Sequence, residues 1–183
     1  MRIYENLIPK VSRDFIKVSI NNGYLLIEKH HTRAAQKDIE SIFRAYLTRL
    51  KDIYLMAKER IEKADGFDRT ALNKIRNQIA AAEKFPLEKH NDSYFVKQLL
   101  ALLFESDNID DVMVSDAKLE ELFLTTCKKN FITDEQMRKE VDKRLFYLPE
   151  FYPDIKPKTK QYRDKVREIR RKLEIAKGLR TYS

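Results

Sequence analysis

The sequence is poor in the residues that build disulfides, tight turns and long apolar segments. Its 183 residues include one Cys, three Gly, five Pro and no Trp. A single Cys excludes an intramolecular disulfide and is typical of a reducing compartment. So few Gly and Pro leave little material for hairpins or long loops, and therefore favour helices. The most apolar stretch, residues 94–104, is far shorter than the ~20 residues of a membrane span.

The first residues, MRIYENLIPK, also lack an apolar run of signal-peptide length. We therefore expect a cytoplasmic protein that has no membrane partner. Apolar residues are nevertheless plentiful and regularly spaced, at 43% of the chain, which excludes a disordered polypeptide. Charged residues make up 36%, against roughly 25% in an average domain, and the balance of Lys and Glu fits a protein from a hot environment.

Helical periodicity predicts an all-α fold of about eight helices, with at most one or two very short strands. A first helix over 8–22 ends at Asn-Asn-Gly, because these residues tolerate the left-handed conformation that closes a helix. Residues 24–28 form a short strand or an extended connector. Thr32 caps a second helix whose register continues to Ala64, as one long helix or as two helices with a bend.

The rest of the chain repeats this plan. The expected elements are a helix ending before Pro86, an apolar helix over 93–104, a helix capped by Ser115, a helix opened by the capping box at 133–136, and a last helix capped by Thr159. A shift of 84 residues places the apolar positions of the first half on those of the second, for example Val11 on Phe95 and Ile39 on Phe123.

This register predicts two related three-helix units. The expected organisation is a first unit with an extra helix over 1–84, a second unit over 85–150, a proline-rich linker over 151–157 and a basic amphipathic helix over 158–183.

The opening MRIYENLIPKVSRDFIKVSINNGYLLIEKHHTRAAQKDIESIFRAYL resembles the bacterial family catalogued as domain of unknown function 507. Members of that family begin with Met-Arg and an aliphatic residue, and continue with a helix, a connector ending in an aliphatic pair and a second charged helix. Pro9, the pair His30-His31 and the strongly basic end depart from the family pattern. The resemblance implies a helical bacterial cytoplasmic protein, and it implies no catalytic residue or cofactor.

The positive charge of the chain is concentrated near its end. Residues 156–180 contain eleven Lys and Arg against three acidic residues, a net charge of +8 that equals the net charge of the whole chain. Residues 1–155 are therefore electrically balanced.

Two surfaces of the last helix are candidates for binding. A coiled-coil-like apolar seam is formed by Tyr162, Val166, Ile169, Leu173 and Ala176. One flank of this seam carries Arg163, Arg167, Arg170 and Lys177. The flank could bind nucleic-acid phosphates, whereas a helix packed on its own body or on a second chain would leave it solvated. The i,i+4 pairs Arg170–Glu174 and Glu168–Lys172 favour the packed helix.

Three other groups of residues are weaker candidates. His30 and His31 are adjacent, so in an extended stretch their side chains point to opposite faces. His90 is distant in the sequence, so no third ligand lies nearby. We therefore expect surface histidines and no bound metal. Carboxylates cluster between residues 105 and 116, and helix capping and solvation explain most of them. One alternative is that they bind a hard cation, although the EF-hand spacing is absent. The other is that they form an acidic counter-surface for the basic tail. Those carboxylates are Glu105, Asp107, Asp110, Asp111 and Asp116.

Cys127 falls on an inward helix position, so we expect an inert buried thiol. No phosphate-binding loop, nucleophile elbow or catalytic triad order is present, so we expect no enzyme and no cofactor. The sequence favours a non-catalytic interaction or scaffold protein with a protein partner or a homo-oligomer. The alternative is a nucleic-acid-binding accessory protein that uses the basic flank.

Overall fold

The structure, a computed structural model, describes residues 1–62, 69–87, 91–131, 134–146 and 160–179. These residues form seven α-helices, one short 3-10 helix and two short strands. In chain order the elements are η1 (Glu5–Leu7), α1 (Ile8–Asn21), β1 (Leu25–Leu26), α2 (Thr32–Glu62), α3 (Arg69–Ala82), α4 (Asp92–Glu105), β2 (Asp111–Val112), α5 (Asp116–Asn130), α6 (Asp134–Phe146) and α7 (Lys160–Ala176).

The all-α prediction is confirmed, and most helix ends lie where the sequence placed them. Gly23 follows α1 with φ +67, the left-handed conformation expected at a helix end. The register that starts at Thr32 belongs to one uninterrupted helix of 31 residues. The described residues therefore hold seven α-helices where the sequence predicted about eight. None of the described helices combines the length and apolar character that a bilayer-spanning helix requires.

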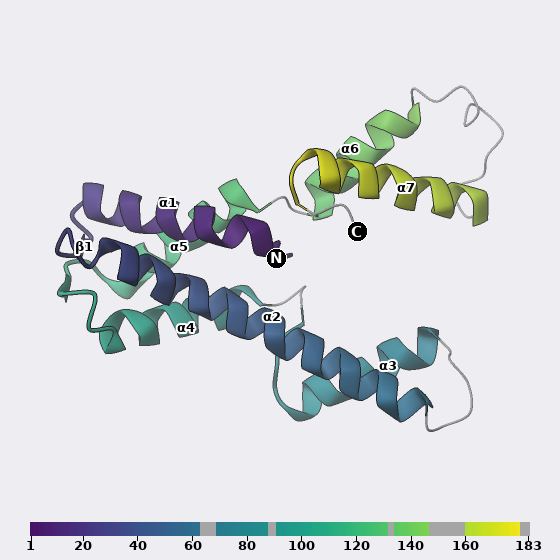
Figure 1. The fold of residues 1–183 in the computed structure, drawn as a ribbon, viewed down its shortest axis with the longest axis horizontal. Helices are drawn as coiled ribbons and strands as arrows, with labels where there is room; N and C mark the ends of the chain where they lie inside the picture. Colours follow the sequence, from purple (N-terminus) through teal and green to yellow (C-terminus); the bar gives the residue numbers. More distant parts are fainter. Residues whose placement is uncertain (63–68, 88–90, 132–133, 147–159, 180–183) are drawn as a thin grey trace.

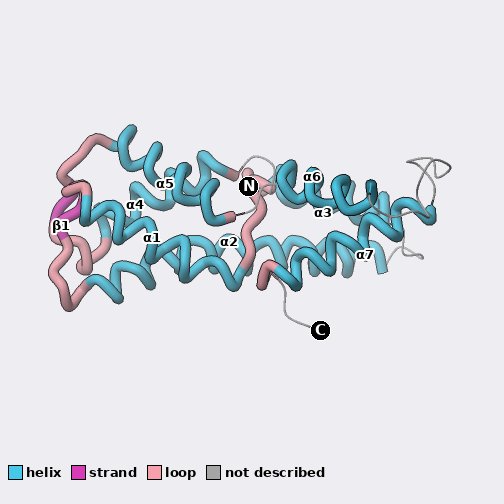
Figure 2. The backbone as a smooth tube through the Cα atoms, turned by 90° about the horizontal axis from the view of Figure 1, so that it is seen from above, coloured by secondary structure: helices cyan, strands magenta, loops and turns pink. Residues whose placement is uncertain are grey.

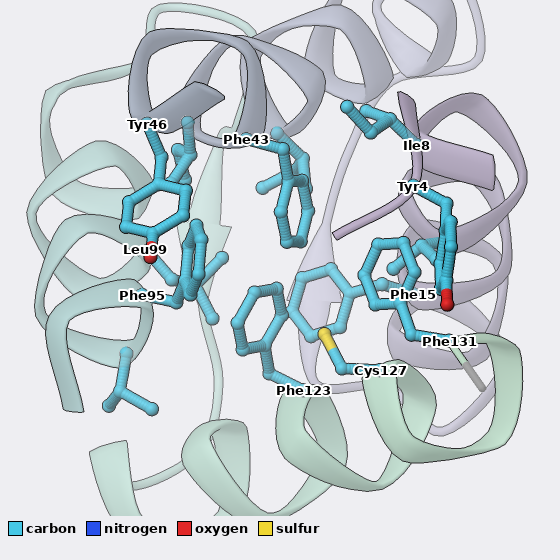
Figure 3. Close-up of a cluster of buried hydrophobic side chains, with 14 of the residues drawn as sticks. Tyr4, Ile8, Phe15, Phe43, Tyr46, Phe95, Leu99, Phe123, Cys127 and Phe131 are labelled. Atoms are coloured by element: carbon cyan, nitrogen blue, oxygen red, sulfur yellow. The ribbon is translucent and has the colours of Figure 1, made fainter. Parts of the chain in front are cut away.

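Four helical segments form the body of the molecule (Figure 1). The helix α1 packs on α2 and α5, and α4 packs on the same two helices, so that the four close into a ring. Phe43 of α2 lies at the centre, with its ring 5.1 Å from that of Phe95, 5.8 Å from that of Phe123 and 5.6 Å from that of Phe131. Figure 3 shows these side chains converging from different helices. Both sequence halves thus contribute to one core.

Two helical arms leave this body (Figures 1 and 2). In one arm, the C-terminal half of α2 packs on α3 around a second, separate core. The buried residues of this core are Ile53, Ala57, Ile61, Leu72, Ile79 and Ala80. In the other arm α6 packs on α7, and the apolar residues of both helices are continuous with the core of the body.

The two strands close the end of the body opposite the arms (Figure 2). They pair antiparallel, with Leu25 opposite Val112 and Leu26 opposite Asp111. The same end is tied by Asp38 of α2, whose Oδ2 accepts hydrogen bonds from Ser106 Oγ at 2.7 Å and Asn108 Nδ2 at 2.8 Å. A surface cavity of about 470 Å³ borders these groups. The Asp38 carboxylate therefore holds the turn after α4 in place.

A buried hydrogen-bond network lies where α2 leaves the body. The side chain of Asn91 is fully buried. Its Nδ2 donates to the carbonyl oxygen of Met1 at 2.9 Å and to the Tyr46 hydroxyl at 3.0 Å, and its Oδ1 accepts from the Met1 amino group at 2.5 Å. The Tyr46 hydroxyl in turn donates to the carbonyl oxygen of Pro86 at 3.1 Å. One amide thus joins the N-terminal segment, α2 and the start of α4.

Replacing Asn91 with Ala should lower the free energy of unfolding by about 1–3 kcal/mol, because several buried polar groups lose their partner. Urea unfolding followed by circular dichroism measures the change. Asn77→Ala, at an exposed position of α3, is the matched control and should change the free energy by less than about 0.5 kcal/mol. Equal effects of the two substitutions would contradict the role assigned to Asn91.

Candidate functional site

The helix α7 is docked onto the rest of the chain by its apolar seam. Ile169 and Leu173 are 6% and 1% exposed, while Tyr162 and Val166 are partly buried against the same cluster. That cluster also contains Tyr4 of the N-terminal segment and three residues of α6, namely Met137, Val141 and Leu145. The predicted seam is therefore an intramolecular contact over these four positions.

The C-terminal end of the seam differs from the prediction. Ala176 is exposed, and the buried residue at this end is Leu179. Gly178 has φ +65, and the amide of Leu179 donates to the carbonyl oxygen of Glu174 at 2.7 Å. The left-handed Gly reverses the chain, so that Leu179 folds back onto the core instead of continuing the helical register. Apolar spacing therefore placed Ala176 at this end of the seam, where the turn at Gly178 places Leu179.

A buried carboxylate fastens α7 to the N-terminal segment. Glu174 is 3% exposed, and its Oε1 lies 3.3 Å from Arg2 Nη2 and 3.2 Å from Arg170 Nε. The Arg2 guanidinium also lies over the ring of Tyr4, 5.2 Å from its centroid. A buried carboxylate is costly unless cations and donors surround it. Glu174 meets this requirement with one Arg from each end of the chain.

Burial raises the pKa of Tyr4 above its ordinary value, while the adjacent Arg2 opposes this shift. The folded state therefore favours the neutral phenol. The stability that Tyr4 contributes is fully present below the unfolded pKa of 10.0 and is lost as the pH rises through the folded value.

The predicted row of four cations on α7 is divided by these contacts. Arg163 and Lys177 are exposed and make no ion pair with another described residue. Arg167 is exposed and pairs with Asp164 at 3.3 Å. Arg170 is instead half-buried and bound to Glu174. The cationic flank available to a partner, defined from here on as Arg163, Arg167 and Lys177, therefore lacks the fourth predicted member.

Two further Lys residues of α7 are engaged within the helix. Glu168 Oε1 lies 2.6 Å from Lys172 Nζ and its Oε2 lies 3.1 Å from Lys165 Nζ. The pKa of Glu168 is below its ordinary value because Lys172 and Lys165 donate hydrogen bonds to the carboxylate. The two i,i+4 pairs expected from the sequence, Arg170–Glu174 and Glu168–Lys172, are confirmed.

The acidic segment lies far from α7. Residues 105–121 contain seven carboxylates and one Lys, a net charge of −6, and surround β2 at the end of the body opposite the arms (Figures 1 and 2). Asp110 accepts a hydrogen bond from the Glu28 amide at 2.8 Å, and Asp111 from the Val112 amide at 2.7 Å. The described part of the tail, residues 160–179, and this segment are therefore not counter-surfaces within one chain.

The histidine pair lies in a turn, whereas the sequence predicted an extended stretch. Residues 28–31 form a turn, not an extended stretch, and the rings of His30 and His31 lie 4.0 Å apart. Glu28 is beside them, with Oε2 3.2 Å from His30 Nδ1. In a turn, neighbouring side chains can lie on the same side of the backbone, whereas along a strand they alternate between two sides. His90 lies outside the described residues.

Cys127 is fully buried beside Phe123 and Phe131 (Figure 3). Burial raises the pKa of the thiol far above its ordinary value, and Asp92 adds to this effect. Because the thiolate is the reactive species, this position cannot supply a nucleophile in the folded protein.

The family model described as "Protein of unknown function (DUF507)" matches residues 1–179. The chain belongs to this family, and the resemblance seen at its opening extends through α7. No curated protein matches the chain. The family description assigns no activity, so the function has to be inferred from the residues themselves.

Glu174→Gln should destabilise the protein by about 1–3 kcal/mol, because the neutral amide cannot balance the two guanidinium groups around it. Thermal unfolding measures the loss. Glu168→Gln removes an exposed carboxylate from the same helix, and should leave the melting temperature close to that of the wild type, because exposed ion pairs contribute little to stability. A larger effect at 168 than at 174 would refute the importance given to the buried cluster.

Cys127 should resist a thiol reagent such as dithionitrobenzoate in the native protein and react fully in about 6 M guanidinium chloride. The rate in native buffer should follow the rate of unfolding. Reaction within seconds in native buffer would show that the thiol is accessible.

Proposed function

We propose that this protein is a non-catalytic interaction protein that presents the cationic flank of α7 to an anionic partner surface. The observation that carries the proposal is the division of α7 into two faces. Its seam is buried by the chain's own residues, whereas Arg163, Arg167 and Lys177 are exposed. The partner surface is therefore the flank, and the seam serves to hold the flank in position.

An acidic protein surface is the partner that fits this flank best. Arg163 and Lys177 are separated by fourteen residues, about 20 Å along a helix, so the flank is a sparse row of charges. Such a row provides electrostatic complementarity and a fast association rate. The docked helix keeps the charges in a fixed order, which limits the entropy that binding would cost.

A nucleic-acid duplex is the second candidate, favoured by the exposed guanidinium group of Arg163, which has no ion-pair partner among the described residues. Phosphate contacts of this kind confer affinity without sequence selectivity. Tyr162 is partly buried against the core, so it is not placed as a stacking platform for single strands.

A second proposal concerns the origin of the fold, as two copies of a three-helix unit. The helix α1 begins at Ile8 and ends at Asn21, and α4 begins and ends 84 residues later, at Asp92 and Glu105. The same shift carries the first and last residues of α2 to the start of α5 and the end of α6. In each half a further helix, α3 or α7, then packs on the end of the long element. These coincidences of helix bounds support the 84-residue register independently of apolar spacing.

The test of function compares two triple variants with the same change of charge. Arg163→Glu/Arg167→Glu/Lys177→Glu reverses the flank, while Lys10→Glu/Arg13→Glu/Lys17→Glu reverses exposed cations of α1. Proteins retained from a lysate by the wild type and the α1 variant should be lost from the flank variant. If both variants retain the same proteins, the flank is not the binding surface.

A labelled duplex tests the second candidate. With three phosphate contacts, affinity should fall about fortyfold between about 50 and 200 mM salt. The flank variant should abolish this binding and the α1 variant should keep it. Binding that does not depend on salt would exclude the flank as the contact.

A further inference from the structure

We propose that the turn preceding α2 binds a divalent first-row transition-metal ion through Glu28, His30 and His31. One ligand atom from each of these residues lies within 4.8 Å of the other two, the one such group of three among the described residues. The site is independent of the cationic flank of α7, and lies at the other end of the molecule (Figure 1).

The spacing of the donor atoms is close to that of a metal site. A tetrahedral ion with bonds of about 2.0–2.1 Å holds its ligand atoms about 3.3 Å apart. Glu28 Oε2 and His30 Nδ1 are already 3.2 Å apart. The rings of His30 and His31 lie 4.0 Å apart with an interplanar angle of 53°. With the donor atom of His31 within 4.8 Å of the other two, side-chain rotations would bring all three toward one ion.

The backbone of the turn is held in this shape without an ion. The amide of His31 donates to the carbonyl oxygen of Glu28 at 2.9 Å, and Thr32 Oγ1 donates to the same oxygen at 3.4 Å. The amide of Glu28 donates to the Asp110 carboxylate at 2.8 Å, which ties the turn to the β2 connector. The amide of Ala35 donates to the carbonyl oxygen of His31 at 2.9 Å and joins the turn to α2. A turn fixed at both ends loses little conformational entropy when its side chains ligate an ion.

One atom of the group is left without a partner. The Nδ1 nitrogen of His31 is shielded from solvent and makes no hydrogen bond with a described residue. Buried polar atoms of folded proteins are almost always paired, with water or an ion as well as with protein. Glu28 and His30 are exposed beside His31, so an ion can reach the group from solvent.

The donor set selects the kind of ion. Two imidazoles and one carboxylate suit Zn²⁺, Cu²⁺ and Ni²⁺, whereas Mg²⁺ and Ca²⁺ take oxygen ligands. Three protein ligands leave a coordination position open to water. The adjacent segment 105–121 has a net charge of −6, which raises the local concentration of cations.

Isothermal titration of the untagged full-length chain with ZnCl₂, at about pH 7.5 in a buffer that does not chelate, tests the proposal. We expect one equivalent of Zn²⁺ to bind with a micromolar Kd. His30→Gln and His31→Gln should each weaken binding by more than about tenfold, and the double variant should abolish it. Because ligating imidazoles must be unprotonated, binding should also weaken as the pH is lowered.

Lys29→Gln is the matched control, since it lies in the same exposed turn and offers no ligand atom. Its Kd should stay within a factor of about three of the wild-type value. Circular dichroism should show that all variants keep a melting temperature close to that of the wild type, because Lys29 and His30 are exposed and His31 is only partly buried. The proposal is overturned if the wild type binds no Zn²⁺, or if the double variant binds it as tightly as the wild type.

Discussion

The uninterrupted helix α2 is the constraint on which the rest of the structure depends, because its two halves belong to two different cores. Its first half carries Phe43 into the aromatic centre of the body, and its second half carries Ile53 and Ile61 into the core of the arm. A break between them would separate the arm from the body. Tyr46 lies between the two regions and is bonded there to Asn91, so the point of transition is fixed by hydrogen bonds as well as by packing.

The second organising feature is the separation of charge along the molecule. Carboxylates gather around β2 at one end, and the cations of α7 lie toward the other (Figure 1). Within α7, carboxylates pair with several of the cations: Glu174 pairs with Arg170, and Glu168 pairs with Lys165 and Lys172. The cationic flank is therefore smaller than the predicted row, because Arg170 is bound to the buried Glu174.

Much of the fold could be predicted from the sequence, because apolar spacing and end signals act locally. The helix end at Gly23, the short strand after it and the start of α2 at Thr32 all follow from neighbouring residues. The continuity of α2 could not be decided, since it depends on α3 packing against its second half. Asn91 gave no signal, because its partners Met1 and Tyr46 are distant in sequence.

The site was predictable to a smaller extent, for the same physical reason. Spacing identified Ile169 and Leu173 as one face of α7. It could not show that Arg2 would reach Glu174 from the other end of the chain and remove Arg170 from the exposed row. The relative direction of the two histidine side chains was not predictable, because alternation was assumed where the backbone turns. Side-chain direction in a turn depends on hydrogen bonds such as that from the Glu28 amide to Asp110.

The pairing of Arg2 with Glu174 has a consequence for how the protein folds. It joins residues from opposite ends of the polypeptide, and contacts of such long sequence separation form slowly because the intervening chain must first be ordered. The body and the α2–α3 hairpin can assemble before α7 finds its place. We therefore expect α7 to dock late in folding and to open early, so its amides should exchange with deuterium sooner than those of the Phe43 core.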